Sequence, residues 1–436
     1  MIRKLASKIL SVTLIGLMLA GMFGVASSEG PYSKITTQGS FDVGPYYLHR
    51  VYYHNGLWWV FGVYMLTTAG GVLIQSGIGY STSSDGVTWS ILKLVGTQQI
   101  MYSIQFDVKF NGEYIEYISS ASNLVYRKGV LQGNGNIQWL SDEQIVSSYE
   151  AKFRVSLLID EEGYAYIFYS DSNNLDIYMM KNRYLDGNWA TDYKLLIRSW
   201  GATPNHDPIV LATRLLNNRI YIISGAYQSW IVPGALYGRV FDVGTKTLGS
   251  EELIIDEAAA GQFPAMVSFE DNVYLLFENR LQNEAFMGRQ DGSWTSQMLV
   301  QIGTFGNWPT LEVDPKTGIL YTTDFAPSGS SVFFKEYKDN LWTEGELIAD
   351  VGNSILEGGN QEEKTSIGYG NNKLAFVFYL GVVSTTGFIE VSLDRIPPIS
   401  PWLSSYQIVI LIVVVGAVAA ALYVRRLARK KRRRSH

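Results

Sequence analysis

One pattern of polar and apolar positions recurs along most of the chain. A polar turn of Gly, Asn or Asp leads into a run of apolar and aromatic residues, as in Asn55-Gly-Leu-Trp-Trp-Val-Phe. Seven copies begin at residues 55, 111, 162, 218, 271, 316 and 372, spaced 45 to 56 residues apart. Each copy predicts a hairpin turn that enters a buried strand. A regular period of this length indicates a repeat architecture.

A second turn, which ends in Trp, accompanies most copies of the first. Its copies end at Trp89, Trp139, Trp189, Trp294 and Trp342, and Leu248 takes the Trp position in a sixth copy. Together the two turns indicate four strands in about 50 residues, which is the size of a β-propeller blade. The chain leaves the last repeat without a fourth strand. We therefore expect the segment Tyr32 to Phe41 to complete that blade and close the ring, which removes open sheet edges.

These patterns predict an all-β fold with seven propeller blades, or six if one repeat is irregular. The composition agrees, because aromatic residues (13%) and 42 Gly favour sheets and turns, whereas charged residues are only 17%. The absence of Cys excludes disulfides, thiolate zinc sites and Cys nucleophiles. With four His as well, we predict no metal site and no cofactor. Ca²⁺ held by backbone carbonyls and Asp side chains stays open.

The two ends of the chain predict its location. Residues 1–28 combine a basic start, an apolar run and small residues, which is typical of a signal peptide; an uncleaved anchor is the alternative. Residues 399–424 hold the apolar run Ile408 to Val424, long enough with its uncharged flank for a transmembrane helix. Eight basic residues in the tail 425–436 place that tail in the cytoplasm. We expect residues 29–398 to form an extracytoplasmic propeller on a single-pass membrane protein. The lack of Cys and of Asn-x-Ser/Thr sites favours a prokaryotic cell surface.

Charge narrows the choice of partners. Without the eleven basic residues of the two ends, 24 basic and 40 acidic residues remain, a net charge of about −16. Nucleic acid is disfavoured as a partner, because its binding depends on a cationic surface. A strongly anionic polymer is disfavoured too, unless a local pocket overrides the overall field.

The first Trp turn, Ser83-Ser84-Asp85-Gly86-Val87-Thr88-Trp89, resembles the Asp box of sialidase-like (BNR-repeat) propellers. In such a turn Asp85 accepts turn amides, Gly86 supplies a positive φ, and Trp89 packs between neighbouring strands, with Ser83 at the first position. With the repeat spacing, the resemblance covers about residues 31–396. Asp boxes in that family are structural and lie away from the ligand, so the resemblance implies a fold and no particular activity.

The resemblance also implies a ligand site at the mouth of the central channel, where sialidases hold a sugar carboxylate with three Arg. The expected mouth residues precede the seven hairpin turns. Our catalytic candidates are the carboxylates Asp107, Asp207 and Glu357, and our ligand-binding candidates are Arg50, Arg154, His206 and Trp308. No third Arg stands at an equivalent position. Each candidate has a structural alternative: ion pairs for the two Arg, a capped turn for His206-Asp207, and a core aromatic for Trp308.

The sequence therefore predicts a membrane-anchored, cell-surface propeller that binds a glycan or a protein at the channel mouth. One alternative is an exo-acting, sialidase-like glycoside hydrolase that uses the mouth carboxylates as acid and base. Another is an architectural protein of the envelope. Two carboxyl groups about 5–10 Å apart at the mouth would favour hydrolysis.

Overall fold

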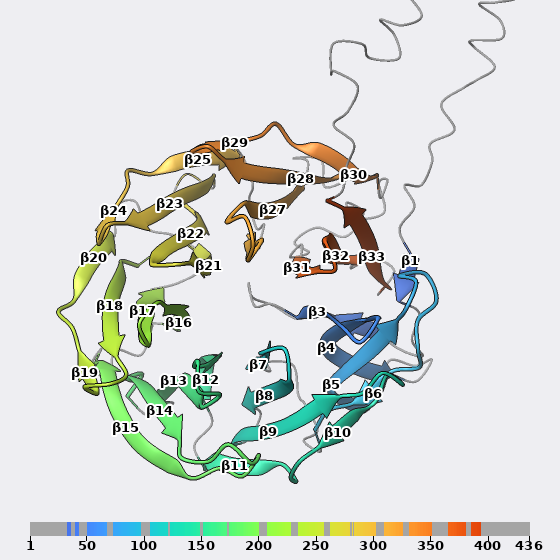
Figure 1. Cartoon of the computed structure of the whole chain (residues 1–436), viewed down its shortest axis with the longest axis horizontal. Helices are drawn as coiled ribbons and strands as arrows, with labels where there is room; N and C mark the ends of the chain where they lie inside the picture. The colour runs from blue at the N-terminus through green and yellow to red at the C-terminus, as the bar shows by residue number, and fades with distance from the viewer. Residues whose placement is uncertain are drawn as a thin grey trace, which may run out of the picture. The chain divides into compact units, whose positions relative to one another are not determined.

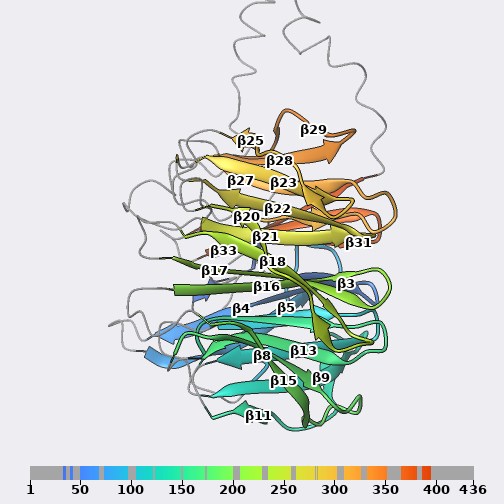
Figure 2. The same ribbon diagram turned by 90° about the vertical axis from the view of Figure 1, so that its left-hand side faces the viewer.

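Seven antiparallel sheets follow one another along the chain and form a ring in the computed structural model (Figure 1). The structure describes residues 33–393 except for connecting segments. Those segments are 36–39, 43–49, 68–72, 97–104, 121–122, 149–150, 172–173, 200–206, 228–233, 257–261, 280, 282, 302–308, 326–330, 351–364 and 381–384. Seen from the side, the strands run roughly along the ring axis (Figure 2). The predicted all-β, seven-bladed propeller is confirmed.

The blades are numbered here in chain order. Blade 1 contains β2 (Ser40–Asp42), β3 (Val51–His54), β4 (Leu57–Thr67), β5 (Leu73–Ser83) and β6 (Lys93–Leu94). Blade 2 contains β7 (Gln105–Phe110), β8 (Tyr114–Ser120), β9 (Leu124–Leu131), β10 (Ile137–Trp139) and β11 (Gln144–Ser147). Blade 3 contains β12 (Ala151–Ile159), β13 (Ala165–Asp171), β14 (Ile177–Asn182) and β15 (Thr191–Arg198). Blade 4 contains β16 (Asp207–Leu215), β17 (Arg219–Tyr227), β18 (Leu236–Asp242), β19 (Thr247–Leu248) and β20 (Glu252–Ile255).

The last three blades repeat this plan. Blade 5 contains β21 (Gln262–Phe269), β22 (Asn272–Glu278), β23 (Glu284–Gln290), β24 (Ser293–Trp294) and β25 (Met298–Gln301). Blade 6 contains β26 (Glu312–Val313), β27 (Leu320–Phe325), β28 (Ser331–Lys338), β29 (Leu341–Trp342) and β30 (Glu346–Asp350). Blade 7 contains β31 (Thr365–Gly370), β32 (Lys373–Leu380), β33 (Thr385–Ser392) and β1 (Ser33–Ile35).

Both recurrent turns lie where the sequence predicts them. The first turn joins the innermost strand of a blade to its second strand, and in blade 1 Asn55 and Gly56 have φ of 51° and 77°. Asn and Gly are the residues that adopt this left-handed conformation most readily, which explains their recurrence at the turn. The Trp turn joins the third strand to the outer strand, as between β23 and β24.

The N-terminal strand closes the ring, as predicted. β1 pairs antiparallel with β33, with Ser33 opposite Phe388 and Ile35 opposite Thr386. The chain thus contributes its first and last described strands to the same blade. The segment Tyr32 to Phe41 also differs from the prediction of a single strand, because Ser40–Asp42 forms β2 and pairs with β4 in blade 1.

The core lies between neighbouring blades. The adjacent residues Trp58 and Trp59 of β4 are both fully buried, yet they belong to different clusters. Trp59 packs with Phe106 of blade 2, and Trp58 packs with Phe388 of blade 7. Because successive side chains of a strand point to opposite faces, a strand between two blades must be apolar on both faces. This accounts for the continuous apolar runs in the repeat.

The outer strands share a β-bulge. In blades 2 to 6 the register of the outer strand shifts by one residue, at Val146, Ile197, Ile254, Val300 and Ile348. Each of these β-branched residues is at least partly buried, and the aliphatic residue before it is exposed. A bulge twists an edge strand away from further pairing, which protects the exposed edges of the ring.

The predicted signal peptide, transmembrane helix and basic tail lie outside the described residues, so these predictions are not tested. Among the residues that the structure describes, no helix is long and apolar enough to cross a membrane.

Candidate functional site

Two of the predicted channel residues, Arg50 and Asp107, have described side chains. Arg50 directly precedes the innermost strand β3, and Asp107 lies on the innermost strand β7 of the next blade. Both are buried, with 2% and 0% of their surface exposed. The Arg50 guanidinium lies 3.7 Å from the ring centre of Phe106 and donates a hydrogen bond of 3.2 Å to the Phe106 carbonyl.

The Asp107 carboxylate joins two blades. Its Oδ1 accepts a hydrogen bond of 2.8 Å from the backbone N–H of Val108, and its Oδ2 accepts one of 2.7 Å from Leu157 on β12. Lys109 Nζ lies 3.8 Å from Oδ1. Burial raises the pKa of Asp107, and Lys109, the two N–H groups and Arg50 counteract that rise in part. These contacts support a structural role, because a substrate would have to displace both backbone donors. A catalytic role for Asp107 stays a prediction.

The other five mouth candidates cannot be brought together from the described residues. Arg154 and Asp207 lie on the innermost strands β12 and β16, but their side chains are outside the description. His206, Trp308 and Glu357 fall in segments that the structure does not describe. Their roles, and the proposed pair of mouth carboxylates, stay predictions.

The turn that resembles an Asp box is fully described. Asp85 Oδ1 accepts hydrogen bonds of 2.8 Å from Val87 N and 2.7 Å from Thr88 N, and it also accepts the Ser83 hydroxyl at 2.9 Å. These donors lower the pKa of Asp85 to about 2. Gly86 has a φ of 69° and donates its N–H to Ser83 Oγ at 2.9 Å.

This turn fastens blade 1 to blade 7. The Trp89 ring packs against Phe388 with ring centres 4.8 Å apart, and its indole N–H donates to Ser33 Oγ at 3.2 Å. Ser33 also donates to the Gly86 carbonyl. Ser33 belongs to the closing strand β1 and Phe388 to β33, so the turn holds together the place where the ring closes.

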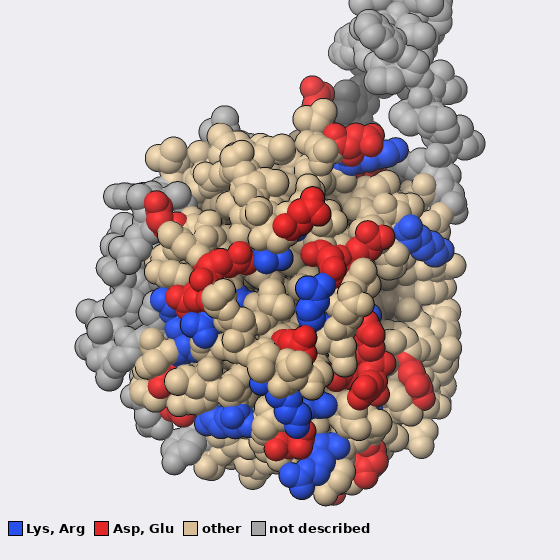
Figure 3. Space-filling view, turned by 60° about the vertical axis from the view of Figure 1, so that its left-hand side comes forward, with Lys and Arg blue, Asp and Glu red and all other residues tan. Residues whose placement is uncertain are grey.

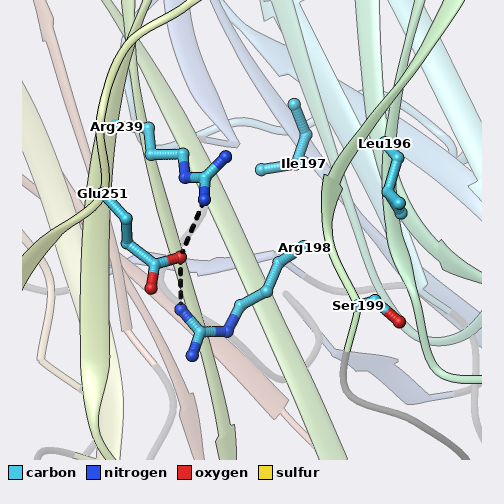
Figure 4. A pocket seen from close by; sticks show the side chains of 6 residues that line it. All are labelled: Leu196, Ile197, Arg198, Ser199, Arg239 and Glu251. Atoms are coloured by element: carbon cyan, nitrogen blue, oxygen red, sulfur yellow. Dashed lines mark ion pairs between the residues drawn. The ribbon is translucent and has the colours of Figure 1, made fainter.

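A pocket of about 350 Å³ opens between blades 3 and 4, away from the innermost strands. Its wall includes Leu196 to Arg198 at the end of β15 and Ser199 just after it. Arg239 of β18 and Glu251, which directly precedes β20, complete the wall from blade 4 (Figure 4). We call it the rim pocket, because β15 and β20 are outer strands.

Two guanidinium groups of the rim pocket converge on one carboxylate. Arg198 Nη1 lies 2.5 Å from Glu251 Oε2, and Arg239 Nη2 lies 3.4 Å from the same oxygen (Figure 4). The Arg198 guanidinium also stacks 3.6 Å from the ring centre of Tyr237. The three charged side chains leave the pocket with a net charge of +1. The pocket thus offers hydrogen-bond donors, acceptor oxygens and the exposed aliphatic side chain of Leu196.

The bulge in β15 places the pocket residues. Ile197 is the extra residue: Leu196 pairs with Tyr178, Arg198 pairs with Ile177, and Ile197 is buried in the interface with blade 4. Sequence reasoning did not identify this pocket. A signal was present, because Arg198 occupies the position after the bulge, where the other bulged outer strands carry Ser147, Ile255, Gln301 and Ala349.

The described part of the chain contains no candidate metal site. No group of three or more His, Asp or Glu residues there could hold a metal ion.

Comparisons with known proteins identify the fold. No family model matches the sequence. No curated protein matches it. A lectin (BP39L) from Burkholderia pseudomallei has a similar structure, with a TM-score of 0.56 at 9% identity over 80% of this chain and 97% of the lectin. An ulvan lyase bound to a saccharide of glucuronic acid and sulfated rhamnose matches with a TM-score of 0.54 at 9% identity, over 83% of this chain and 96% of the lyase.

A sialidase is also among the similar structures. The NanB sialidase from Streptococcus pneumoniae matches with a TM-score of 0.40 at 11% identity, over 85% of this chain and 70% of the sialidase. At identities near 10%, the matches establish a shared β-propeller fold, and membership of the Asp-box family stays a prediction.

Proposed function

We propose that this protein is a cell-surface β-propeller that binds a carbohydrate and is anchored by the segment 399–424. The observation that carries the proposal is the rim pocket, where Arg198, Arg239 and Glu251 place donors and acceptors side by side. A sugar hydroxyl both donates and accepts hydrogen bonds, so a mixed set of fixed partners can orient it. Leu196 adds an aliphatic surface for the C–H groups of a sugar ring.

The comparisons support the ligand class at the level of the fold. A lectin and a polysaccharide lyase share this architecture over most of their lengths, and the lyase structure contains a bound saccharide. We extend this ligand class to the present chain as part of the proposal. The rim pocket lies away from the channel mouth, and a second ligand site at the mouth stays a prediction from the sequence. The hydrolase alternative depends on Asp207 and Glu357, and no observation on their side chains favours it.

The test is a glycan-array screen of the full-length, detergent-solubilised protein, followed by calorimetry on the glycans that bind. We expect at least one saccharide to bind, and Glu251→Gln to weaken the binding of a neutral saccharide by about 10-fold, the usual loss when one charged hydrogen-bond partner is removed. The matched control is Glu252→Gln. Glu252 is the next residue and is similarly exposed, but it pairs with Arg289 of blade 5. Equal losses in both variants, or no binding by a folded protein, would refute the proposal.

A further inference from the structure

We infer that the rim pocket between blades 3 and 4 binds an acidic saccharide, one that carries carboxylate or sulfate groups. This inference rests on the proposed function and adds the charge of the ligand. It concerns the described residues that line the seam between the two blades. The ectodomain as a whole has a net charge of about −16, so a positive seam is a local departure from the rest of the surface.

Two groups of ion pairs at this seam together contain four basic and two acidic side chains. The first group is the rim pocket, with Arg198, Arg239 and Glu251. The second group is Arg183, Asp192 and Lys246, where Arg183 Nε and Lys246 Nζ lie 4.0 Å and 3.6 Å from the two oxygens of Asp192. Lys246 comes from blade 4 and Asp192 from blade 3, so this group also bridges the seam. The two groups together have a net charge of +2.

The two groups are built alike. In both, two cations share one carboxylate, and in the pocket they share a single oxygen of Glu251. Within the described part of the chain, the Arg239 guanidinium contacts Glu251 through Nη2 alone. A guanidinium has five N–H donors in a planar fork that matches a carboxylate or sulfate. Arg239 therefore retains donors that an anionic ligand group can use.

The next seam shows that this excess of positive charge is not a general property of the blade interfaces. Between blades 4 and 5, Arg289 pairs with Glu252 at 2.8 Å, one cation to one carboxylate. Tyr221 donates its hydroxyl hydrogen to the same Glu252, and the Trp294 indole N–H donates to Tyr221 at 3.1 Å. This network has no net charge, and its four side chains are hydrogen-bonded to one another. It gives a matched control site in the same molecule.

The flank of the ring that carries β15, β18 and β20 comes forward in Figure 3. Lys and Arg side chains are interspersed on it with Asp and Glu side chains. The acidic residues elsewhere on the ectodomain act weakly here, because charges more than about 8 Å apart across solvent are screened at physiological ionic strength. A saccharide in the rim pocket therefore experiences mainly the two cations and one carboxylate of that pocket, and its affinity should fall as salt is added. A longer saccharide can also reach the second group, because Asp192 lies six residues from Arg198 along β15, about 20 Å at the usual rise of a strand.

The experiment compares acidic saccharides with neutral forms of the same molecules. The full-length protein in detergent is titrated by calorimetry with oligogalacturonate and hyaluronan hexasaccharides, each beside its carboxyl methyl ester. A uronate-free, sulfated galactan oligosaccharide separates sulfate recognition from carboxylate recognition. We expect at least one acidic probe to bind about 10-fold more tightly than its neutral partner, as the loss of a charge-assisted, bidentate contact predicts. The difference should shrink as salt is raised.

Two variants locate the effect. Arg239→Gln should abolish the preference for the acidic probe, whereas Arg289→Gln, which removes an equal charge from the neutral seam, should leave it unchanged. Equal affinity for acidic and neutral forms, or equal losses in the two variants, would overturn this inference. Neutral glycans that bind on the array and depend on Glu251 would still support the proposed function in that case. If the folded protein binds no saccharide of any kind, both the inference and the proposed function fail.

Discussion

Replacement of Asp107 by Asn distinguishes a structural role from a catalytic one at a fully buried carboxylate on an innermost strand. Each carboxylate oxygen accepts one backbone N–H, from Val108 within blade 2 and from Leu157 in blade 3. An Asn side chain has a single oxygen, so its NH₂ group must face one of the two N–H donors. That donor then loses its acceptor in a site with no exposure to solvent.

The expected cost follows from this geometry. A buried N–H without a partner costs about 1–3 kcal/mol, and the loss of attraction to Lys109 and Arg50 adds to it. Burial raises the pKa of Asp107, which shows that its charge is itself unfavourable there, so a neutral side chain offsets part of the cost. We expect a net loss of about 2 kcal/mol in the free energy of unfolding. For a propeller of this size that corresponds to a fall of about 3 °C in Tm.

The assay is thermal unfolding followed by circular dichroism, with urea unfolding to measure the change in free energy. Asp142→Asn, at an exposed aspartate outside this junction, is the matched control and should leave Tm unchanged. Saccharide binding by Asp107→Asn should equal that of the wild type once the protein is folded. An unchanged Tm combined with lost turnover of a glycoside would refute the structural explanation and identify Asp107 as a catalytic residue.

Three further predictions concern ring closure, pH and anchoring. Trp89→Ala should lower the free energy of unfolding by about 2–3 kcal/mol in urea titrations, because it removes the ring contact with Phe388 and the hydrogen bond to Ser33 on the closing strand. A loss no larger than that of Trp139→Ala, at a turn inside blade 2, would argue against a special role in closure. The pKa of Asp85 in the folded protein is about 2, below its ordinary value of 3.8, so its contribution to stability is present above that value and is lost as the pH falls towards 2. Between about pH 5 and pH 2, Tm should therefore fall less in Asp85→Ala than in the wild type. An equal fall of Tm in the two proteins over this range would contradict the prediction. Removal of residues 399–436 should release the protein from the membrane fraction, and retention there would contradict the predicted anchor.

The fold could be predicted from the sequence because its turns have strict conformational requirements. The left-handed φ at Asn55 and Gly56 restricts the residues that fit, and the same restriction in each repeat makes the period visible. The closing strand could be predicted because the seventh repeat has no outer strand of its own and needs one from elsewhere in the chain. β2 was not anticipated, because three residues, Ser40–Asp42, are too short to show an alternating pattern.

The site was harder to predict because it depends on contacts between sheets. Asp107 was expected at the channel mouth because it lies on an innermost strand, but strand position alone cannot show that Leu157 of the next blade seals its carboxylate. The bulge at Ile197 also makes the site residues hard to predict from the sequence. An extra residue reverses the alternation of inward and outward positions, so a period of two misassigns the residues beyond it, including Arg198.

A comparison of the outer strands with one another shows that Arg198 is unusual. The outer strands of blades 2 to 6 have the same bulge, and the residue after it pairs with the start of the third strand in each case. Four of these positions are filled by uncharged residues, so the fold does not require a cation there. Arg198 nevertheless occupies this position beside the buried Ile197, which anchors it to the interface core. A charge that packing does not require, held on a rigid strand and facing a second Arg, is preorganised for a ligand. Replacing Arg198 with Gln, the residue of blade 5, should therefore reduce saccharide binding while leaving Tm nearly unchanged, and a large fall in Tm would show that the cation serves the fold instead.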